Sequence, residues 1–182
     1  MPDTTHDPAI HIVDYNRSWP REFDREAAKL HDALGRVAVR IDHVGSTSVP
    51  GLAAKPIIDI SVSVQSVYPM DDYRRPLEKL GYLFVYASGS PDFHFFGKPA
   101  LRPRTHHIHV CKLGSGHEYR HLAFRNYLRA HPHEAERYAA VKRSIGAKHP
   151  GDRLAYIAGK QDIVDEIEKK SLAWANKAGW MY

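Results

Sequence analysis

The chain predicts an α+β fold in a single domain over residues 1–182, with a mixed sheet, flanking helices and a helical C-terminal part. Its 182 residues are enough for one domain with a substantial core. Short apolar runs with strand-like spacing fill most of the first two thirds of the chain, and past Gly114-Ser115-Gly116 the apolar spacing becomes helical. Strands followed by a block of helices are typical of the α+β class.

The N-terminal part predicts an edge strand and then an amphipathic helix. Residues 10–15 are expected to pair at the edge of the sheet. Ser18 is the candidate N-cap of the helix, and Pro20 fits its first turn, where a missing amide hydrogen costs nothing. Gly35 is expected to end the helix. The core face of this helix is formed by apolar residues at helical spacing, namely Phe23, Ala27, Leu30 and Leu34.

The remaining elements are predicted from apolar runs bounded by turn residues. Strands are expected over residues 37–44, 57–64, 82–86, 92–96 and 105–110. A helix over residues 71–80 is closed by Gly81. The C-terminal part, residues 117–178, is divided by two His-Pro breaks into helices over residues 117–130, 133–148 and 153–178.

Composition and charge narrow the class of partner. The chain is 43% apolar and 26% charged, with a formal net charge of +5 and 13 histidines. This balance fits either an ordinary basic surface or an electropositive cleft for a small anion. Long basic runs are absent, so nucleic acid is the weaker expectation, and no apolar stretch is long enough to cross a membrane. A single cysteine, Cys111, and an N-terminus without a secretory pattern lead us to expect a cytoplasmic protein.

Residues 43–60 are the most informative stretch, because a Gly-Ser turn lies there between two apolar strands. Gly45 permits a tight turn, and Ser46 and Thr47 would offer amides and hydroxyls to a phosphate. Asp59 is the one acidic residue in the second strand, and a buried carboxylate is costly unless it is paired. Asp59 is therefore expected to act as a metal ligand or general base, with a structural ion pair as the alternative.

Two histidines on the last predicted strand are the next candidates. His107 and His109 are two residues apart, so their side chains share one face of the strand. With His43 and Asp59 they could form a metal site or an acid–base cluster, and the alternative is that they only hydrogen-bond their neighbours. The candidate catalytic residues, which are also the candidate metal ligands, are Asp59, His107 and His109.

Basic residues would complete a phosphate site. Lys55 precedes the strand that carries Asp59, and Arg125 and Arg129 share one face of a predicted helix. Each could instead be a solvated surface charge or part of an ion pair. The candidate phosphate- or ligand-binding residues are Gly45, Ser46, Thr47, Lys55, Arg125 and Arg129.

The run over residues 42–60, DHVGSTSVPGLAAKPIIDI, resembles the signature of the GrpB-like family. Three further segments agree, over residues 15–20, 107–110 and 122–129, together with two Tyr-x-x-x-Lys pairs, Tyr138 with Lys142 and Tyr156 with Lys160. The resemblance spans nearly the whole chain. It implies a nucleotidyltransferase-type fold with a polymerase-β-like palm, and it implies a fold more than a reaction.

The chain departs from the active-site pattern of that superfamily. Its members use Asp-x-Asp or Asp-x-Glu and a later carboxylate to hold two metal ions. Here Ser61 takes the second position, and the later strand offers His107 and His109. Asn126 also stands where the resemblance implies aspartate. The cofactor candidates are therefore Mg²⁺ or Mn²⁺ at oxygen ligands, and Zn²⁺ if the histidines bind the metal.

These observations together predict a divergent nucleotidyltransferase-fold protein that binds a nucleotide or another phosphorylated or anionic small molecule. A nucleoside triphosphate is one candidate ligand, and transfer of a nucleotidyl group is one candidate activity. Because Ser61 leaves the metal site incomplete, weak or absent magnesium-dependent transfer is expected. The alternatives are a non-catalytic ligand-binding or interaction module of the same fold, and a histidine-rich metal site with a non-nucleotidyl reaction.

Overall fold

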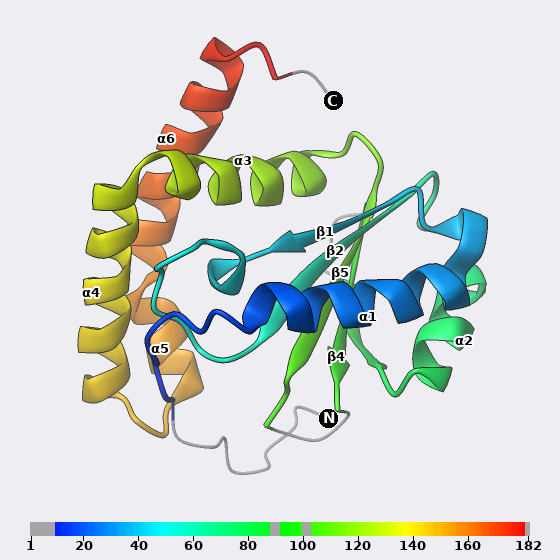
Figure 1. Cartoon of the computed structure of the whole chain (residues 1–182), viewed down its shortest axis with the longest axis horizontal. Coiled ribbons are helices and arrows are strands. Elements are labelled where there is room, and N and C mark those ends of the chain that lie inside the picture. Colours follow the sequence, from blue (N-terminus) through cyan, green and yellow to red (C-terminus); the bar gives the residue numbers. More distant parts are fainter. Residues whose placement is uncertain (1–9, 88–91, 100–102, 181–182) are drawn as a thin grey trace.

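A five-stranded mixed sheet forms the centre of the molecule (Figure 1). The computed structural model describes residues 10–87, 92–99 and 103–180. The strand order is β1-β2-β5-β4-β3, in which β2 and β5 run parallel and every other neighbouring pair runs antiparallel. The strands are β1 (Arg40–Val44), β2 (Ile58–Val64), β3 (Leu83–Ala87), β4 (Phe93–Lys98) and β5 (His106–Lys112).

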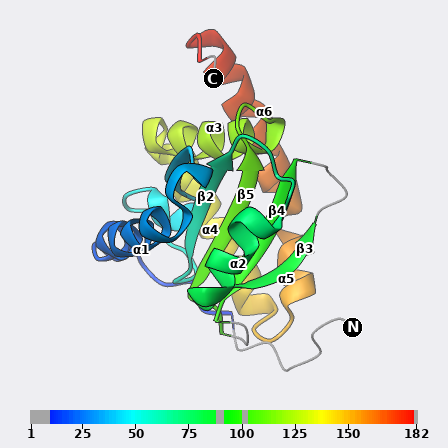
Figure 2. The ribbon, with the colours of Figure 1, turned by 90° about the vertical axis from the view of Figure 1, so that its right-hand side faces the viewer.

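Helices cover both faces of the sheet, in agreement with the predicted flanking helices and helical C-terminal part. One face is covered by α1 (Trp19–Leu34) and α2 (Asp71–Lys79). The other face meets α3 (Gly116–Ala130), which leads into the C-terminal helices α4 (Pro132–Lys148), α5 (Arg153–Gly159) and α6 (Gln161–Lys177). Figure 2 shows α2 in front of the sheet and α4, α5 and α6 behind it.

The alternation of β2 separates the apolar core from the polar face of the sheet. Ile58, Ile60 and Val62 are buried among the apolar side chains of α1 and α2. Asp59 and Ser61 therefore lie on the opposite face, which α3 to α5 cover. Polar groups that are held between a sheet and helices must be hydrogen-bonded or ligand-facing. This is the face on which the candidate site forms.

Residues 10–15 are not the edge strand that the sequence predicts. Within this segment only Val13 forms a β-bridge, through two backbone hydrogen bonds of 2.9 and 3.0 Å with Ala54 in the loop before β2. The carbonyl of Ile12 instead accepts a hydrogen bond of 3.2 Å from Arg143 of α4. Because its polar groups are used in this way, the segment joins α4 to the loop before β2 and does not extend the sheet.

Two other N-terminal predictions also need correction. The strand predicted over residues 37–44 begins only at Arg40, because Gly35–Val37 forms a 3₁₀ turn after α1. Ser18 occupies the N-cap position of α1, but its hydroxyl donates to the carboxylate of Glu22 instead of accepting from a backbone amide. Local hydrogen bonding thus replaces the predicted cap.

The helix predicted over residues 153–178 is two helices, α5 and α6, which are separated at Lys160. Gly159 ends α5 in close contact with α4, since a β-carbon at this position would lie 3.0 Å from Ile145 Cγ2. The remaining strands and helices differ from the predictions only at their ends. None of the helices among the described residues is long and apolar enough to cross a membrane.

Candidate functional site

The Gly-Ser turn follows β1 directly and lies against β2. Gly45 has a φ of +67°, which is a conformation that glycine adopts at little cost. A β-carbon at this position would lie 2.4 Å from Asp59 Oδ2, so no other residue fits there without movement. The following Ser46–Ser48 is a 3₁₀ turn rather than the start of a longer helix. The sequence prediction of a turn beside Asp59 is therefore confirmed.

His43 and Thr47 fix the turn from the inside. The hydroxyl of Thr47 donates to the carbonyl of Ile57 (3.1 Å) and therefore accepts from His43 Nε2 (3.0 Å). The His43 ring also stacks on Phe23, with 4.8 Å between centroids. Burial lowers the pKa of His43 to about 4, although the charge of Asp59 opposes the shift. His43 thus anchors the turn through Thr47 and Phe23.

Asp59 is paired with two histidines of the neighbouring strand. The parallel register places Asp59 beside His107 and Ser61 beside His109. Asp59 Oδ1 lies 3.0 Å from His107 Nδ1 and 3.5 Å from His109 Nε2, and a carboxylate can only accept. Burial would raise the pKa of Asp59, but these two hydrogen bonds hold it well below its usual range. The prediction that the three side chains converge is confirmed.

The same geometry does not fit a shared metal site. His107 and His109 use one ring nitrogen each on Asp59, so their other nitrogens point away from that carboxylate. The position that carries a second carboxylate in the superfamily is the fully buried Ser61. Across the described ranges, no group of three or more His, Cys, Asp or Glu side chains is arranged to hold a metal ion. These donors do not match a two-magnesium site.

A pocket of about 220 Å³ opens where the turn, β2 and β5 meet α4 and α5. The sheet side contributes Ser46, Thr47, Ala54, Lys55, Ile57, Asp59 and His107. The helical side contributes Tyr138, Lys142, Arg153, Tyr156, Ile157 and Lys160. The pocket is therefore lined by four cationic side chains and a single carboxylate.

Lys142 is the most unusual of these cations, because it is only 3% exposed. Its Nζ donates to Ser46 Oγ at 2.9 Å and lies 4.3 Å from the centre of the Tyr138 ring. Burial lowers the pKa of Lys142 to about 7, and the nearby charge of Lys160 adds to the shift. This lysine joins α4 to the Gly-Ser turn across the pocket.

Two further lysines lie over the ring of Tyr156, which is itself buried. Lys55 Nζ lies 5.1 Å and Lys160 Nζ 5.8 Å from the centre of this ring. Burial lowers the pKa of Lys160, while Asp59 opposes that shift. Lys142 and Lys160 were not among the predicted site residues. Their sequence signal was the repeated Tyr-x-x-x-Lys spacing, which places each lysine one helical turn after a pocket tyrosine.

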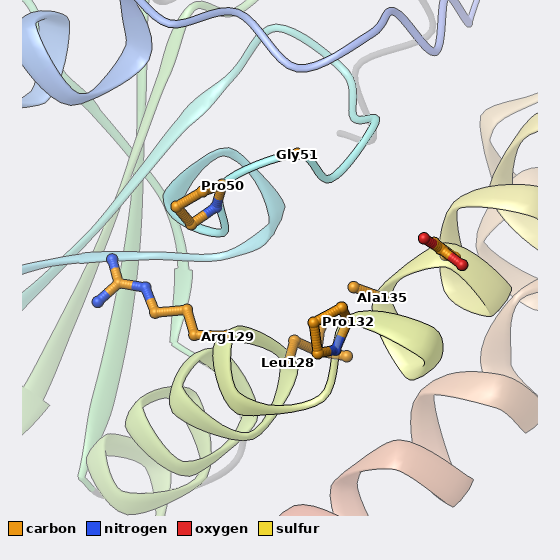
Figure 3. A pocket seen from close by; sticks show the side chains of 7 residues that line it. Pro50, Gly51, Leu128, Arg129, Pro132 and Ala135 are labelled. Atoms are coloured by element: carbon orange, nitrogen blue, oxygen red, sulfur yellow. The ribbon is translucent and has the colours of Figure 1, made fainter.

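Arg125 and Arg129 do not line this pocket. Arg125 Nη1 donates to the carbonyl of His43 (2.9 Å) and to Asp42 (3.2 Å). Arg129 donates to the carbonyl of Ser48 at 2.7 and 3.0 Å. Figure 3 shows Arg129 extending from α3 toward the Pro50 turn, in a separate hollow of about 450 Å³. Both arginines therefore stabilise the backbone of the turn on the side away from the pocket, and neither contributes a positive charge to the pocket.

The remaining predicted site residues are placed as follows. Ser46, Thr47, Lys55, Asp59 and His107 line the pocket. His109 does not line the pocket; it contacts Asp59 and packs among aromatic side chains that include Phe93 and Phe95. Gly45 presses on Asp59 without lining the pocket.

Comparison with known proteins identifies the family and the fold of the chain. Residues 9–170 match the family described as GrpB protein. The chain belongs to the GrpB family. The crystal structure of the conserved protein GrpB from Enterococcus faecalis is 35% identical, has a TM-score of 0.83, and is matched over 90% of this chain and 98% of that one. Cid1 in complex with its short product ApU matches 71% of this chain and 42% of its own at a TM-score of 0.50 and 12% identity, which shows a common nucleotidyltransferase-like fold alone.

Two further relatives extend the comparison within the GrpB family. The protein PA4798 of Pseudomonas aeruginosa is 39% identical over 170 residues, which cover 92% of this chain and 69% of that protein. YqkA of Bacillus subtilis is 36% identical over 165 residues, or 91% of this chain. The chain spans about half of the length of YqkA, 48%. Both carry only a family number as a description, UPF0157.

Proposed function

We propose that this chain binds the phosphate group of a small phosphorylated molecule in the pocket between the Gly-Ser turn and helices α4 and α5. The observation that carries the proposal is Lys142, a buried lysine whose ammonium donates to Ser46. Burying an ammonium is costly unless an anion or a hydrogen-bonded partner compensates it. A neutral serine compensates only in part, and a bound phosphate would complete the compensation.

The charge of the pocket supports the same assignment. Lys55, Lys142 and Lys160 lie around it, and Arg153 also lines it. Asp59 is its one acidic side chain, and one of its oxygens already accepts from two histidines. Like charges that line a partly buried cavity concentrate a counter-ion of the opposite sign. The pocket is therefore suited to an anion rather than to a second cation.

The size of the pocket limits how much of the ligand it holds. A whole drug-sized ligand fills on the order of 300–1,000 Å³, which exceeds the volume of about 220 Å³ found here. We expect the pocket to take the phosphate end and the rest of the ligand to extend outward. A nucleotide is one candidate ligand. The buried rings of Tyr138 and Tyr156 line the pocket, and each ring contacts the lysine that follows it by four residues.

Magnesium-dependent nucleotidyl transfer is the less favoured function. That reaction uses several carboxylates to hold two metal ions, whereas Asp59 stands alone among lysines. Electrostatic repulsion from Lys55, Lys142 and Lys160 would oppose a divalent cation beside Asp59. Non-catalytic binding of a phosphorylated ligand is compatible with every contact described above.

Kinase activity is not proposed. The dephospho-CoA kinase of Mycolicibacterium paratuberculosis is 32% identical over 197 residues, which cover 94% of this chain but only 48% of that protein. Its name describes the whole of that protein, and about half of it has no counterpart here.

The test measures the melting temperature with inorganic phosphate, pyrophosphate or ATP in the presence of a chelator. Each is compared with chloride at the same ionic strength, because a ligand of the folded state raises the melting temperature by mass action. We expect phosphate to raise it in the wild type and in Lys148→Met, where the changed lysine is exposed on α4. Lys142→Met and Lys160→Met should lose the rise. An equal rise with chloride, or an unchanged rise in both pocket variants, contradicts the proposal.

A further inference from the structure

Ser46 and Lys142 form a pair that binding alone does not require. They come from the turn after β1 and from α4, and Lys142 Nζ lies 2.9 Å from Ser46 Oγ. A hydroxyl within hydrogen-bond distance of a buried amine is the arrangement of a nucleophile and its base. Serine with lysine in place of histidine is a known variant of that arrangement.

The surroundings keep this amine ready to accept a proton. Lys142 is 3% exposed, and the ring of Tyr138 lies against its Nζ. The groups that face Lys142 include Lys55, Lys160, Arg143 and Asp59, of which only Asp59 favours the charged form. With its pKa lowered to about 7, Lys142 is present in both forms at neutral pH. The ammonium form donates to Ser46 Oγ, and the neutral amine can accept the Ser46 proton across the same distance, as a general base needs.

The remaining cations lie where a reacting phosphoryl group would need them. Lys55 and Lys160 border the same pocket and leave Lys142 free to handle a proton. In phosphoryl transfer, positioning and neutralisation of the equatorial oxygens supply most of the catalysis. A carbonyl substrate would gain less from this set of cations, so the pocket favours a phosphate ester or anhydride.

We infer that Ser46 is a nucleophile toward a phosphate monoester or anhydride, with Lys142 as its general base. This inference rests on the proposed function, because the phosphate must first bind among the pocket cations. The pair is distinct from the carboxylates that serve nucleotidyl transfer, and Asp59 takes no part in the bond changes.

The bond changes balance in two steps. In the first, the Ser46 Oγ–P bond forms and the bond from phosphorus to the leaving oxygen breaks. The hydroxyl proton of Ser46 passes to Lys142 Nζ, and the leaving oxygen departs with the electron pair and takes up a proton from Lys142. In the second, water attacks the phosphorus, Lys142 removes one of its protons, and the Ser46 Oγ–P bond breaks as Oγ is reprotonated. The sum is an ester plus water giving an alcohol plus phosphate.

The test uses p-nitrophenyl phosphate as the probe and mass spectrometry of the whole chain and its peptides as the readout. We expect a phosphoryl group on Ser46 that is absent from Ser46→Ala and retained in Ser48→Ala, whose changed hydroxyl bonds Gly45 and does not line the pocket. Lys142→Arg keeps the charge but cannot accept a proton. This variant should slow labelling by about 100-fold or more while phosphate binding remains. If the arginine prevents folding, Lys142→Gln replaces it and is compared with the wild type at saturating probe, because loss of the charge weakens phosphate binding.

The outcomes separate the two proposals. Phosphate binding without any labelling of Ser46 between pH 6 and pH 9 overturns the inference and leaves the proposed function in place. Equal labelling of the wild type and both Lys142 variants also overturns it, because Lys142 would not be the base. If Ser46→Ala still binds phosphate but is not labelled, and Lys142→Arg binds phosphate but is labelled about 100-fold more slowly, the inference stands. Absence of phosphate binding in the wild type refutes the proposed function itself.

Discussion

Gly45 and Asp59 lie so close together that a β-carbon on Gly45 would come within 2.4 Å of Asp59 Oδ2 and 2.9 Å of its Cβ. The Gly-Ser turn can therefore approach β2 only because residue 45 has no side chain. The contact sets the position of Ser46, the next residue, relative to the carboxylate.

Gly45→Ala should destabilise the protein by more than about 2 kcal/mol, because it combines a strained φ with a clash against Asp59. Gly51→Ala is the matched control, since Gly51 also has a positive φ (+80°) but nothing lies within 4 Å of its β-carbon position. Urea unfolding of both variants separates the two effects. Equal losses of stability in the two variants would show that the clash between the new β-carbon and Asp59 adds nothing to the cost of the positive φ.

Asp59→Asn should strengthen phosphate binding several-fold, because it removes the one negative charge from a cationic pocket. It should also lower the free energy of unfolding by about 1–3 kcal/mol, since His107 and His109 lose a charged acceptor. Asp42→Asn, outside the pocket, is the control for binding. Titration with and without Mg²⁺ checks the result, and weaker binding that depends on the metal would favour a metal-ligand role for Asp59.

Lys142→Met should stabilise the protein at pH 6 by more than about 1 kcal/mol. The folded pKa of about 7 lies below the usual 10.5, so the unfolded state binds more protons between these values. The wild type therefore loses stability as the pH falls from 10.5 to 7, and the penalty is complete below 7. The difference between the variant and the wild type should shrink toward pH 10. A difference that stays constant with pH would refute this account.

His43→Gln should flatten the loss of stability in acid. The pKa of buried His43 is about 4 when folded and about 6.5 when unfolded, so stability falls as the pH drops from 6.5 to 4. The contribution of one such group is about 1.4 kcal/mol per pH unit in that window. Urea unfolding at pH 7 and pH 4.5 measures the slope. The same slope in His43→Gln and in the wild type would assign the acid sensitivity to other groups.

Glu118→Gln should cost about 1–3 kcal/mol, because it removes a buried charged acceptor from Arg40, Gly114 and Ser63. The carboxylate of Glu118 is fully buried and accepts from Arg40 (2.8 Å), from the amide of Gly114 (2.6 Å) and from Ser63. Glu78→Gln, which breaks an exposed pair with Arg74, should cost less than about 1 kcal/mol. Denaturant midpoints of the two variants give the comparison, and similar losses would contradict the role given to burial.

Much of the sheet and half of the site could be predicted from local pattern. The alternation of β2 places Asp59 opposite the apolar face, and the two-residue spacing of His107 and His109 places both on one side of β5. The convergence of these three side chains was predicted correctly, whereas the register that places Asp59 beside His107 is known only from the structure. The family resemblance to GrpB proteins also predicted the fold class.

The helical side of the pocket could not be predicted in the same way. Periodicity shows that Arg125 and Arg129 share one face of α3, but it does not show which surface that face meets. Helical spacing places Lys142 and Lys160 one turn after a tyrosine, but it gives no sign that Lys142 would meet Ser46 or that Lys160 would line the same pocket, because no local pattern encodes how two distant elements pack. The break at Lys160 follows from the contact of Gly159 with Ile145, which is also tertiary.

The place of β5 in the sheet has a consequence for synthesis of the chain. It is the last strand to leave the ribosome, yet it lies between β2 and β4. Until residues 106–112 are available, the newly made β1-β2 and β3-β4 pairs each expose an open edge that can join a neighbouring nascent chain. Insertion of β5 closes both edges and, in the same event, brings His107 and His109 to Asp59. Protection of the nascent chain and completion of this carboxylate–histidine cluster are therefore a single folding step.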